Sequence, residues 1–261
     1  MGALPANRSL VILAVSLVVG MNLPNAEASA SHGNALWRVV HGLCMRNMRL
    51  TGSPAPCLAV DAAAGVAVVP DPNPRRRTQV LLTPTARLEG IESPELLRAG
   101  GPNYWQAAWD ARRYFEARAG RSVPRDVIAL AINSSVSRSQ NQLHIHVDCI
   151  RADVRAALKA HEGEINHAWT PLAFPLAGRI YKARSLDGAE LGQRNPFEIL
   201  ARGDPVARAH MGLFTLVVVG VVGADGAPGF VLLSDQVDVK ARHPAFGEEL
   251  QDHRCAVLRG P

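Results

Sequence analysis

Residues 140–149 read QNQLHIHVDC and alternate between polar and apolar side chains. Because successive side chains of a β-strand point to opposite faces, this pattern predicts a strand over residues 140–150. One face then carries the apolar residues, and the other carries His144 and His146 side by side in a polar row. Imidazole groups titrate near neutral pH, so the pair suits a nucleophile or a base.

Three interpretations of this pair compete. In the first, one histidine attacks a phosphorus atom and its neighbour adjusts the charge of the site. In the second, His144 and His146 bind a metal ion, which requires a third ligand such as Asp148. In the third, a half-exposed strand carries two histidines that do no chemistry. Outside the metal interpretation, Asp148 and Cys149 are expected to be structural.

The neighbouring strands must place the histidines on a sheet. Residues 127–132 form an apolar strand, and residues 134–139 a polar turn that leads to the histidine segment. Two further pairs of apolar runs predict hairpins, because segments rich in Pro, Gly, Asn or Asp join them. The pairs are 65–69 with 78–83, and 213–222 with 229–233.

The clearest predicted helix covers residues 104–119. Asn103 is a good N-cap, Gln106 stands at the third helical position as in a capping box, and Gly120 is a natural stop. Shorter helices are predicted over residues 153–162 and 34–44. In the latter, one side carries Leu36, Trp37, Val40 and Leu43.

Composition indicates a folded chain of mild positive charge. Of 261 residues, 48% are hydrophobic, and 28 basic residues against 23 acidic ones give a net charge of +5. Basic residues cluster only at 75–77 and aromatic residues are 5%, which argues against a nucleic-acid-binding protein. An anionic membrane surface or an anionic substrate fits this charge. The 75–77 cluster lies in a proline-rich turn, so its side chains are expected to be solvated, with a lipid contact as the alternative.

The first 30 residues have the order of a secretory signal. Arg8 precedes an apolar run at 10–19, and small residues follow in an A-x-A pattern. The apolar stretch is about 14 residues long, whereas a helix needs roughly 20 to span a bilayer. A cleaved signal is therefore favoured over a permanent anchor, and both are compatible with an exported domain over residues 31–261.

The four cysteines agree with export. An even number in an oxidising compartment indicates two disulfides, and three pairings exist. Cys44–Cys57 is favoured because it closes a short loop that contains two prolines, which leaves Cys149–Cys255. No C-x-x-C spacing is present, which argues against a zinc ribbon.

Several stretches together resemble the histidine-triad (HIT) superfamily, and more closely its bacterial CDP-diacylglycerol pyrophosphatase family. They are LLTPT at 81–85, ESP at 92–94, NYWQAAWDAR at 103–112, LAINS at 130–134, SQNQLHIH at 139–146 and CIR at 149–151. The combination is specific, whereas a His-x-His pair alone is not. In this chain the first position of the triad is Gln142 instead of histidine.

The resemblance implies an α+β fold of the HIT-like type, with an antiparallel sheet flanked by helices and a C-terminal extension. It implies hydrolysis of the pyrophosphate bond of CDP-diacylglycerol to CMP and phosphatidate. The middle histidine of the superfamily, His144 here, is the nucleophile and forms a nucleotidyl-histidine intermediate, while His146 assists it. The expected substrate-binding residues are Asn133, Ser139, Gln142 and Arg138, although Arg138 also fits an ordinary surface role.

The same resemblance implies CDP-diacylglycerol at a membrane surface as the partner, with no nucleic acid, metal or cofactor, and a homodimer as one candidate assembly. The expected location is the periplasmic face of the inner membrane through the N-terminal segment, or the periplasm if that segment is cleaved. The alternative function is an exported nucleotide- or lipid-binding module of the same fold that lacks turnover because of Gln142.

Overall fold

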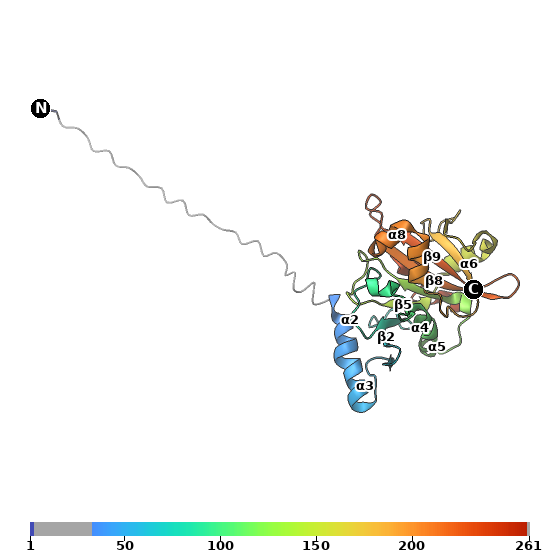
Figure 1. The fold of residues 1–261 in the computed structure, drawn as a ribbon, viewed down its shortest axis with the longest axis horizontal. Helices are drawn as coiled ribbons and strands as arrows, with labels where there is room; N and C mark the ends of the chain where they lie inside the picture. The colour runs from blue at the N-terminus through green and yellow to red at the C-terminus, as the bar shows by residue number, and fades with distance from the viewer. Residues whose placement is uncertain (3–32, 260–261) are drawn as a thin grey trace.

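The computed structural model describes residues 1–2 and 33–259 (Figure 1). The predicted export segment, residues 1–30, lies outside the described residues apart from its first two. Within the described part, none of the helices combines the length and the apolar character needed to cross a membrane.

The strands of residues 33–259 belong to one antiparallel sheet with the order β1-β2-β3-β5-β4-β8-β9-β7-β6. The strands are β1 (Ala59–Asp61), β2 (Val66–Pro70), β3 (Val80–Pro84), β4 (Ile128–Ile132), β5 (Ile145–Cys149), β6 (Thr170–Pro171), β7 (Lys182–Asp187), β8 (Phe214–Val222) and β9 (Pro228–Gln236). The predicted antiparallel sheet of an α+β protein is confirmed. The C-terminal part of the described chain adds β6–β9 to the same sheet beyond β4.

Helices cover both faces of the sheet. The helices are α2 (Ala35–Trp37), the π-helix η1 (Arg38–Cys44), α3 (Met45–Thr51), α4 (Tyr104–Asp110), α5 (Arg112–Ala119), α6 (Ala152–Ala160), α7 (Pro196–Gly203) and α8 (Pro205–Ala209), with short 3-10 turns between them. Aromatic side chains of α4, α5 and α7 pack on one face. On the other face, α6 packs on β4, β8 and β9, while α2 and η1 pack on β2 and β3.

The predicted helix at 104–119 is two helices, because the backbone tightens at Ala111 (φ −67°, ψ −10°). Its ends are confirmed: the Asn103 side chain accepts hydrogen bonds from two backbone N–H groups, and Gly120 ends α5 in the left-handed region. The predicted capping box does not form, because the Gln106 side chain instead donates to Glu190 and accepts from the backbone N–H of Gly192.

The helix predicted over 34–44 continues to Thr51, and its middle is a π-helix. A π-helix has more residues per turn than an α-helix, which changes the buried side. Leu36, Val40 and Cys44 are buried, whereas Leu43 is exposed and its predicted place on the packed side is wrong.

Both disulfides have the favoured pairing, Cys44–Cys57 and Cys149–Cys255. Both predicted hairpins are also confirmed, as β2–β3 and β8–β9. The histidine strand is shorter than predicted and begins only at Ile145. Residues 140–144 form a loop because their backbone groups bind elsewhere; Leu143 N donates to Leu88 O at 2.6 Å.

Candidate active site

The histidine pair lies where the packing on one sheet face is interrupted. In the sheet, His146 of β5 stands between Leu81 of β3 and Ala131 of β4. Leu81 belongs to the apolar cluster under η1, and Ala131 to the cluster under α6. The polar row therefore occupies the gap between two apolar clusters, as the alternation of residue types predicted for β5.

His144 is oriented by the backbone of its own loop. Its Nδ1 lies 2.7 Å from the carbonyl oxygen of Gln142. A carbonyl can only accept, so Nδ1 carries the proton and Nε2 of the neutral ring holds the lone pair. Burial lowers the pKa of His144 below 6.5, against the opposing effects of the Gln142 carbonyl and of Glu248. At neutral pH the ring is therefore neutral, as a nucleophile must be.

His146 packs edge-to-face on His144, with 4.8 Å between ring centroids. Its Nδ1 lies 3.2 Å from Oε2 of Glu248, without the direction of a hydrogen bond, so their contact is electrostatic. Burial lowers the pKa of His146 to about 3, although the Glu248 carboxylate acts in the opposite direction. Both rings of the pair are thus neutral at pH 7.

Glu248 is the centre of the site and was not predicted. Its carboxylate, only 5% exposed, accepts hydrogen bonds from Arg76 at 2.6 Å and from Asn133 at 2.7 Å. Burial acts to raise the pKa of Glu248, but His146, Arg76 and Asn133 together lower it to about 2. Glu248 is therefore a carboxylate, and the predicted residue Asn133 uses its amide to hold it.

Arg76 corrects the expectation of a solvated basic turn. Arg75 and Arg77 are exposed, but Arg76 turns inward to Glu248 and lies 3.6 Å from Asp71. The three arginines look alike in the sequence, and only the distant partner Glu248 distinguishes them.

The segment that carries Glu248 is packed tightly against the sheet. A Cβ atom at Gly247 would lie 2.4 Å from Thr215 Oγ1, so only glycine allows this approach. Further along, the Gln251 side chain donates to the backbone oxygens of Ala129 (2.8 Å) and His146 (3.1 Å). These contacts fix the position of Glu248 beside β5.

Asp148 has structural partners, as expected. It is fully buried and accepts a hydrogen bond at 2.8 Å from His253, and its neighbour Cys149 forms the disulfide with Cys255. Burial raises the pKa of the Asp148 carboxyl, against the opposing hydrogen bond from His253. His253, like Glu248, gave no signal in the sequence.

The metal interpretation finds no support in the geometry of the pair. Among residues 33–259, the side chains that converge as metal ligands are Asp148 with two disulfide cysteines, and Asp235 with His243 and Glu249. Neither set contains His144 or His146. In the second set, Arg179 lies 3.2 Å from Asp235 and Tyr181 donates to Glu249, so protein groups already supply the partners.

The loop before His144 carries the other predicted residues. Gln142 was expected to donate to a phosphate, but here its amide donates to the backbone oxygens of Pro84 (3.0 Å) and Ala86 (2.9 Å). Arg138 is largely buried and forms an ion pair with Glu92, while Ser139 is exposed. The structure thus brings His146 and Asn133 to Glu248, with His144 packed against His146, and places Gln142, Arg138 and Ser139 in the loop before His144.

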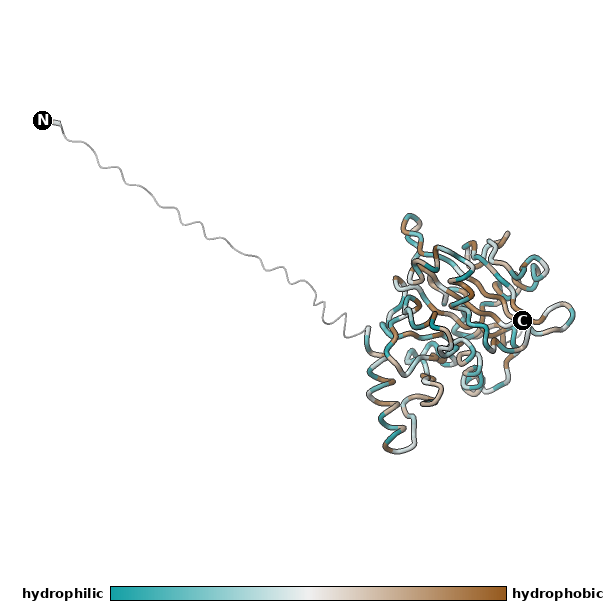
Figure 2. The backbone as a smooth tube through the Cα atoms, viewed as in Figure 1, coloured by the Kyte–Doolittle hydropathy of each residue, from teal (hydrophilic) through white to brown (hydrophobic). Residues whose placement is uncertain are grey.

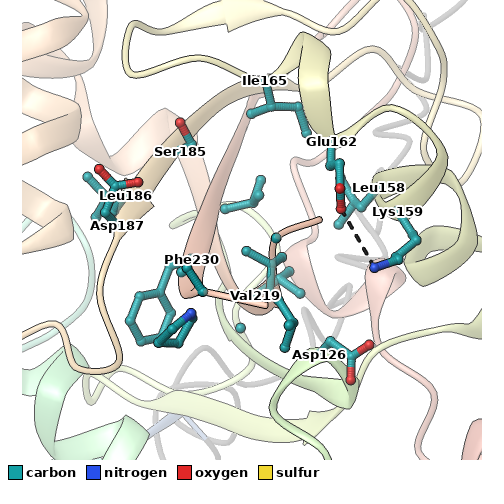
Figure 3. Close-up of a pocket in the computed structure, with 18 of the residues that line it drawn as sticks. Asp126, Leu158, Lys159, Glu162, Ile165, Ser185, Leu186, Asp187, Val219 and Phe230 are labelled. Carbon is teal, nitrogen blue, oxygen red and sulfur yellow. Dashed lines mark ion pairs between the residues drawn. The ribbon is translucent and has the colours of Figure 1, made fainter. Parts of the chain in front are cut away.

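Two hollows lie near this face of the sheet. One, of about 860 Å³, adjoins the Glu248 network and is lined by Arg76, Gln251 and His253 together with Asn73, Arg75, Arg151, Ala152, Asp153, Asp252 and Arg254. The other, of about 610 Å³, lies toward the turn of the β8–β9 hairpin. Figure 3 shows its apolar floor at Val219 and Phe230. None of the predicted site residues lines either hollow, but the first is lined by four arginines and adjoins Glu248 through Arg76, so it is the better candidate for an anionic ligand.

Comparisons with known proteins identify the family of the chain. The family model for CDP-diacylglycerol pyrophosphatase matches residues 31–259. A CDP-diacylglycerol pyrophosphatase from Yersinia pestis is 38% identical over 249 residues, which cover 95% of this chain and 92% of that protein. The match includes both histidines and the distant segment that holds Glu248. The chain therefore belongs to the CDP-diacylglycerol pyrophosphatase family, whose members are hydrolases.

Proposed function

We propose that the chain hydrolyses the pyrophosphate bond of CDP-diacylglycerol to CMP and phosphatidate, with His144 as the nucleophile. Family membership supports the overall reaction. The observation that carries the mechanism is the hydrogen bond from His144 Nδ1 to the Gln142 carbonyl. It leaves Nε2 as the nitrogen with a free electron pair.

In the first step, His144 Nε2 attacks the cytidylyl phosphorus, and the bond to the phosphatidate oxygen breaks with its electrons on phosphatidate. The ring then holds both the new N–P bond and the Nδ1 proton, so it is cationic. The Gln142 carbonyl stabilises this charge by accepting from Nδ1. In the second step, water attacks the same phosphorus and breaks the N–P bond. CMP leaves, a proton passes to the phosphates or solvent, and neutral His144 is restored.

His146 assists through a hydrogen bond to a phosphate oxygen or to the bridging oxygen. Its pKa of about 3 is set mainly by burial. The negative charge of a bound pyrophosphate raises the pKa of a neighbouring imidazole, and Glu248 at 3.2 Å compensates the proton that His146 then gains. His146 thus becomes a donor when the substrate is present.

The remaining predicted residues surround these steps. Arg138 exchanges its ion pair with Glu92 for a phosphate, and the Ser139 hydroxyl contacts the phosphates from the exposed loop. Asn133 positions Glu248 with one amide hydrogen and offers the other to the substrate. Gln142 supports the loop whose carbonyl holds His144. We also propose that the chain is related to the HIT superfamily and that it acts at the periplasmic face of the inner membrane.

The test is release of CMP from CDP-diacylglycerol in mixed micelles. His144→Ala should reduce the rate by about a thousandfold or more, because the nucleophile is lost. His167→Ala, an exposed histidine, is the matched control and should retain full activity. Labelled CMP trapped on the wild type in an acid-labile bond, and absent from His144→Ala, would support the intermediate. Near-normal activity of His144→Ala would refute the nucleophile assignment.

The same assay separates the alternatives. Binding of CDP-diacylglycerol by the wild type without any CMP release would identify a binding module. Loss of activity in excess chelator, with recovery on adding back a divalent metal, would identify a metal enzyme.

A further inference from the structure

The N-terminal part of the described chain forms a projecting arm, which we define as residues 35–51 (α2, η1 and α3). Its first half packs Leu36, Val40 and Cys44 against β2 and β3. Its second half, α3, buries none of its side chains and extends away from the body (Figure 1). The Cys44–Cys57 disulfide joins the middle of the arm to the chain leading into β1. The arm is thus fixed at its base and middle, and the Asn47 amide also binds Ala55 O at 2.6 Å, while the end of α3 is exposed.

The arm exposes large apolar side chains. Leu43, near the end of η1, is 48% exposed, and in α3 Met48 is 39% and Leu50 70% exposed, so three of the large exposed hydrophobic residues of the described chain lie on the arm. Leu43 and Leu50 are about two helical turns apart, so they lie on the same side, whereas Met48 lies on nearly the opposite side. Figure 2 shows hydrophobic and hydrophilic segments alternating along this helix. Single exposed leucines are common, but two exposed leucines on one side of a projecting helix indicate a contact surface.

The charge of the arm selects the kind of partner. Residues 31–60 contain no aspartate or glutamate, whereas Arg38, Arg46 and Arg49 are exposed on the arm. A helix with exposed apolar side chains and only basic charges suits an anionic lipid surface. A symmetric contact between two copies through this helix would bring the same arginines together, which like-charge repulsion disfavours.

The base of the arm touches the loop that orients the nucleophile. Leu36 N donates to the Gln140 side chain at 2.9 Å, and Asn141 N donates to Gly33 O at 2.5 Å. The next residue, Gln142, supplies the carbonyl that holds His144. In the sequence, the apolar run at 10–19 precedes the arm. The base of the arm therefore lies beside the histidine loop.

We propose that the arm docks on an anionic phospholipid bilayer through Leu43, Leu50 and its arginines, so that the histidine site meets its lipid at the membrane surface. This inference deepens the proposed function and rests on it for the identity of the lipid. Docking itself is measured without substrate, so the two can fail separately.

The first measurement is hydroxyl-radical labelling of the full chain with phosphatidylglycerol vesicles, with phosphatidylcholine vesicles and without lipid. Labelling of Leu43 and Leu50 is normalised to Val239, which is 83% exposed and lies outside the arm. Docking should protect Leu43 and Leu50 with phosphatidylglycerol only, and less at high salt because the arginine contribution is screened. Equal labelling with and without phosphatidylglycerol would overturn the proposal.

The second measurement compares Leu43→Ser/Leu50→Ser with the control Val239→Ser/Arg242→Gln. CMP release from CDP-diacylglycerol in phosphatidylglycerol vesicles should fall about tenfold or more in the arm variant, because buried leucine area is lost. Release from water-soluble CDP-glycerol should be unchanged. Arg46→Gln/Arg49→Gln, which keeps the apolar groups, should lose the preference for phosphatidylglycerol.

The outcomes remain distinguishable. Equal vesicle activity of the arm variant and the control would overturn docking. A wild type that releases no CMP from either substrate would contradict the proposed function, while the labelling still decides docking. Sedimentation without lipid tests whether the arm instead binds a second copy of the chain. A wild-type dimer that becomes a monomer in Leu43→Ser/Leu50→Ser would overturn the proposal, because the arm would then be a contact between copies.

Discussion

Replacing Glu248 tests whether the site is organised as the structure shows. In Glu248→Ala, the buried amide of Asn133 loses its acceptor at 2.7 Å, and an unsatisfied buried group costs about 1–3 kcal/mol. Arg76 loses its partner at 2.6 Å but keeps Asp71 at 3.6 Å and is 26% exposed. Breaking the Arg76–Glu248 ion pair should therefore cost well below the roughly 3–5 kcal/mol that breaking a fully buried pair costs. The sum is a loss of about 2–4 kcal/mol in the free energy of unfolding.

Glu248→Gln separates charge from shape. The amide keeps one accepting oxygen, so the expected loss of stability is only about 1–2 kcal/mol. The missing charge removes the group that raises the pKa of His146. Each unit by which the pKa of His146 falls reduces its protonated fraction about tenfold. We therefore expect kcat for CMP release to fall about tenfold or more in Glu248→Gln, with little change in KM.

Urea denaturation and steady-state kinetics check both effects. Glu164→Gln, which changes an exposed carboxylate on the surface, is the matched control and should stay within about 0.5 kcal/mol of the wild type. The reasoning would be refuted if Glu248→Ala unfolded at the wild-type urea concentration. Wild-type kcat in Glu248→Gln would show that the carboxylate only stabilises the fold.

Two further predictions concern the acid range and the C-terminal disulfide. The pKa of His144 is lowered from 6.5, and the neutral ring is the form that attacks. The value of kcat/KM should therefore still be level at pH 6.5 and decline only at lower pH, where His144 becomes protonated; an inflection at or above pH 6.5 would contradict this. Cys149→Ala/Cys255→Ala should be about 2–5 kcal/mol less stable than the wild type, because the disulfide closes a separation of 106 residues. The variant should also lose CMP release, because the disulfide holds the segment after Glu248 in place. The comparison is Cys44→Ala/Cys57→Ala assayed on CDP-glycerol, and equal losses of activity in the two variants would refute the special role of the C-terminal disulfide.

Local features of the fold could be predicted because short-range interactions determine them. The N-cap at Asn103 and the stop at Gly120 depend on backbone groups within a few residues. The β2–β3 and β8–β9 hairpins follow from apolar runs joined by turn residues. The Cys44–Cys57 disulfide likewise closes a loop of only 13 residues' separation.

Other elements were missed where the local pattern is weak or misleading. Strand β7 reads KARSLD and is mostly polar, yet it pairs with β9 over its whole length. Residues 140–144 alternate like a strand, but hydrogen bonds to Gly33 and Leu88 hold them as a loop. In both cases contacts with distant residues outweigh the local preference.

The sequence by itself determined the pair His144 and His146, because the alternation of a strand places both on one polar face, and it determined the family through motifs along the chain. Only the tertiary structure decided which nitrogen of His144 is free and which carboxylate stands beside His146. Glu248 is separated by 115 residues from Asn133 and by 172 from Arg76. No spacing rule connects residues so far apart, since their contact exists only after the C-terminal segment has folded back onto the sheet.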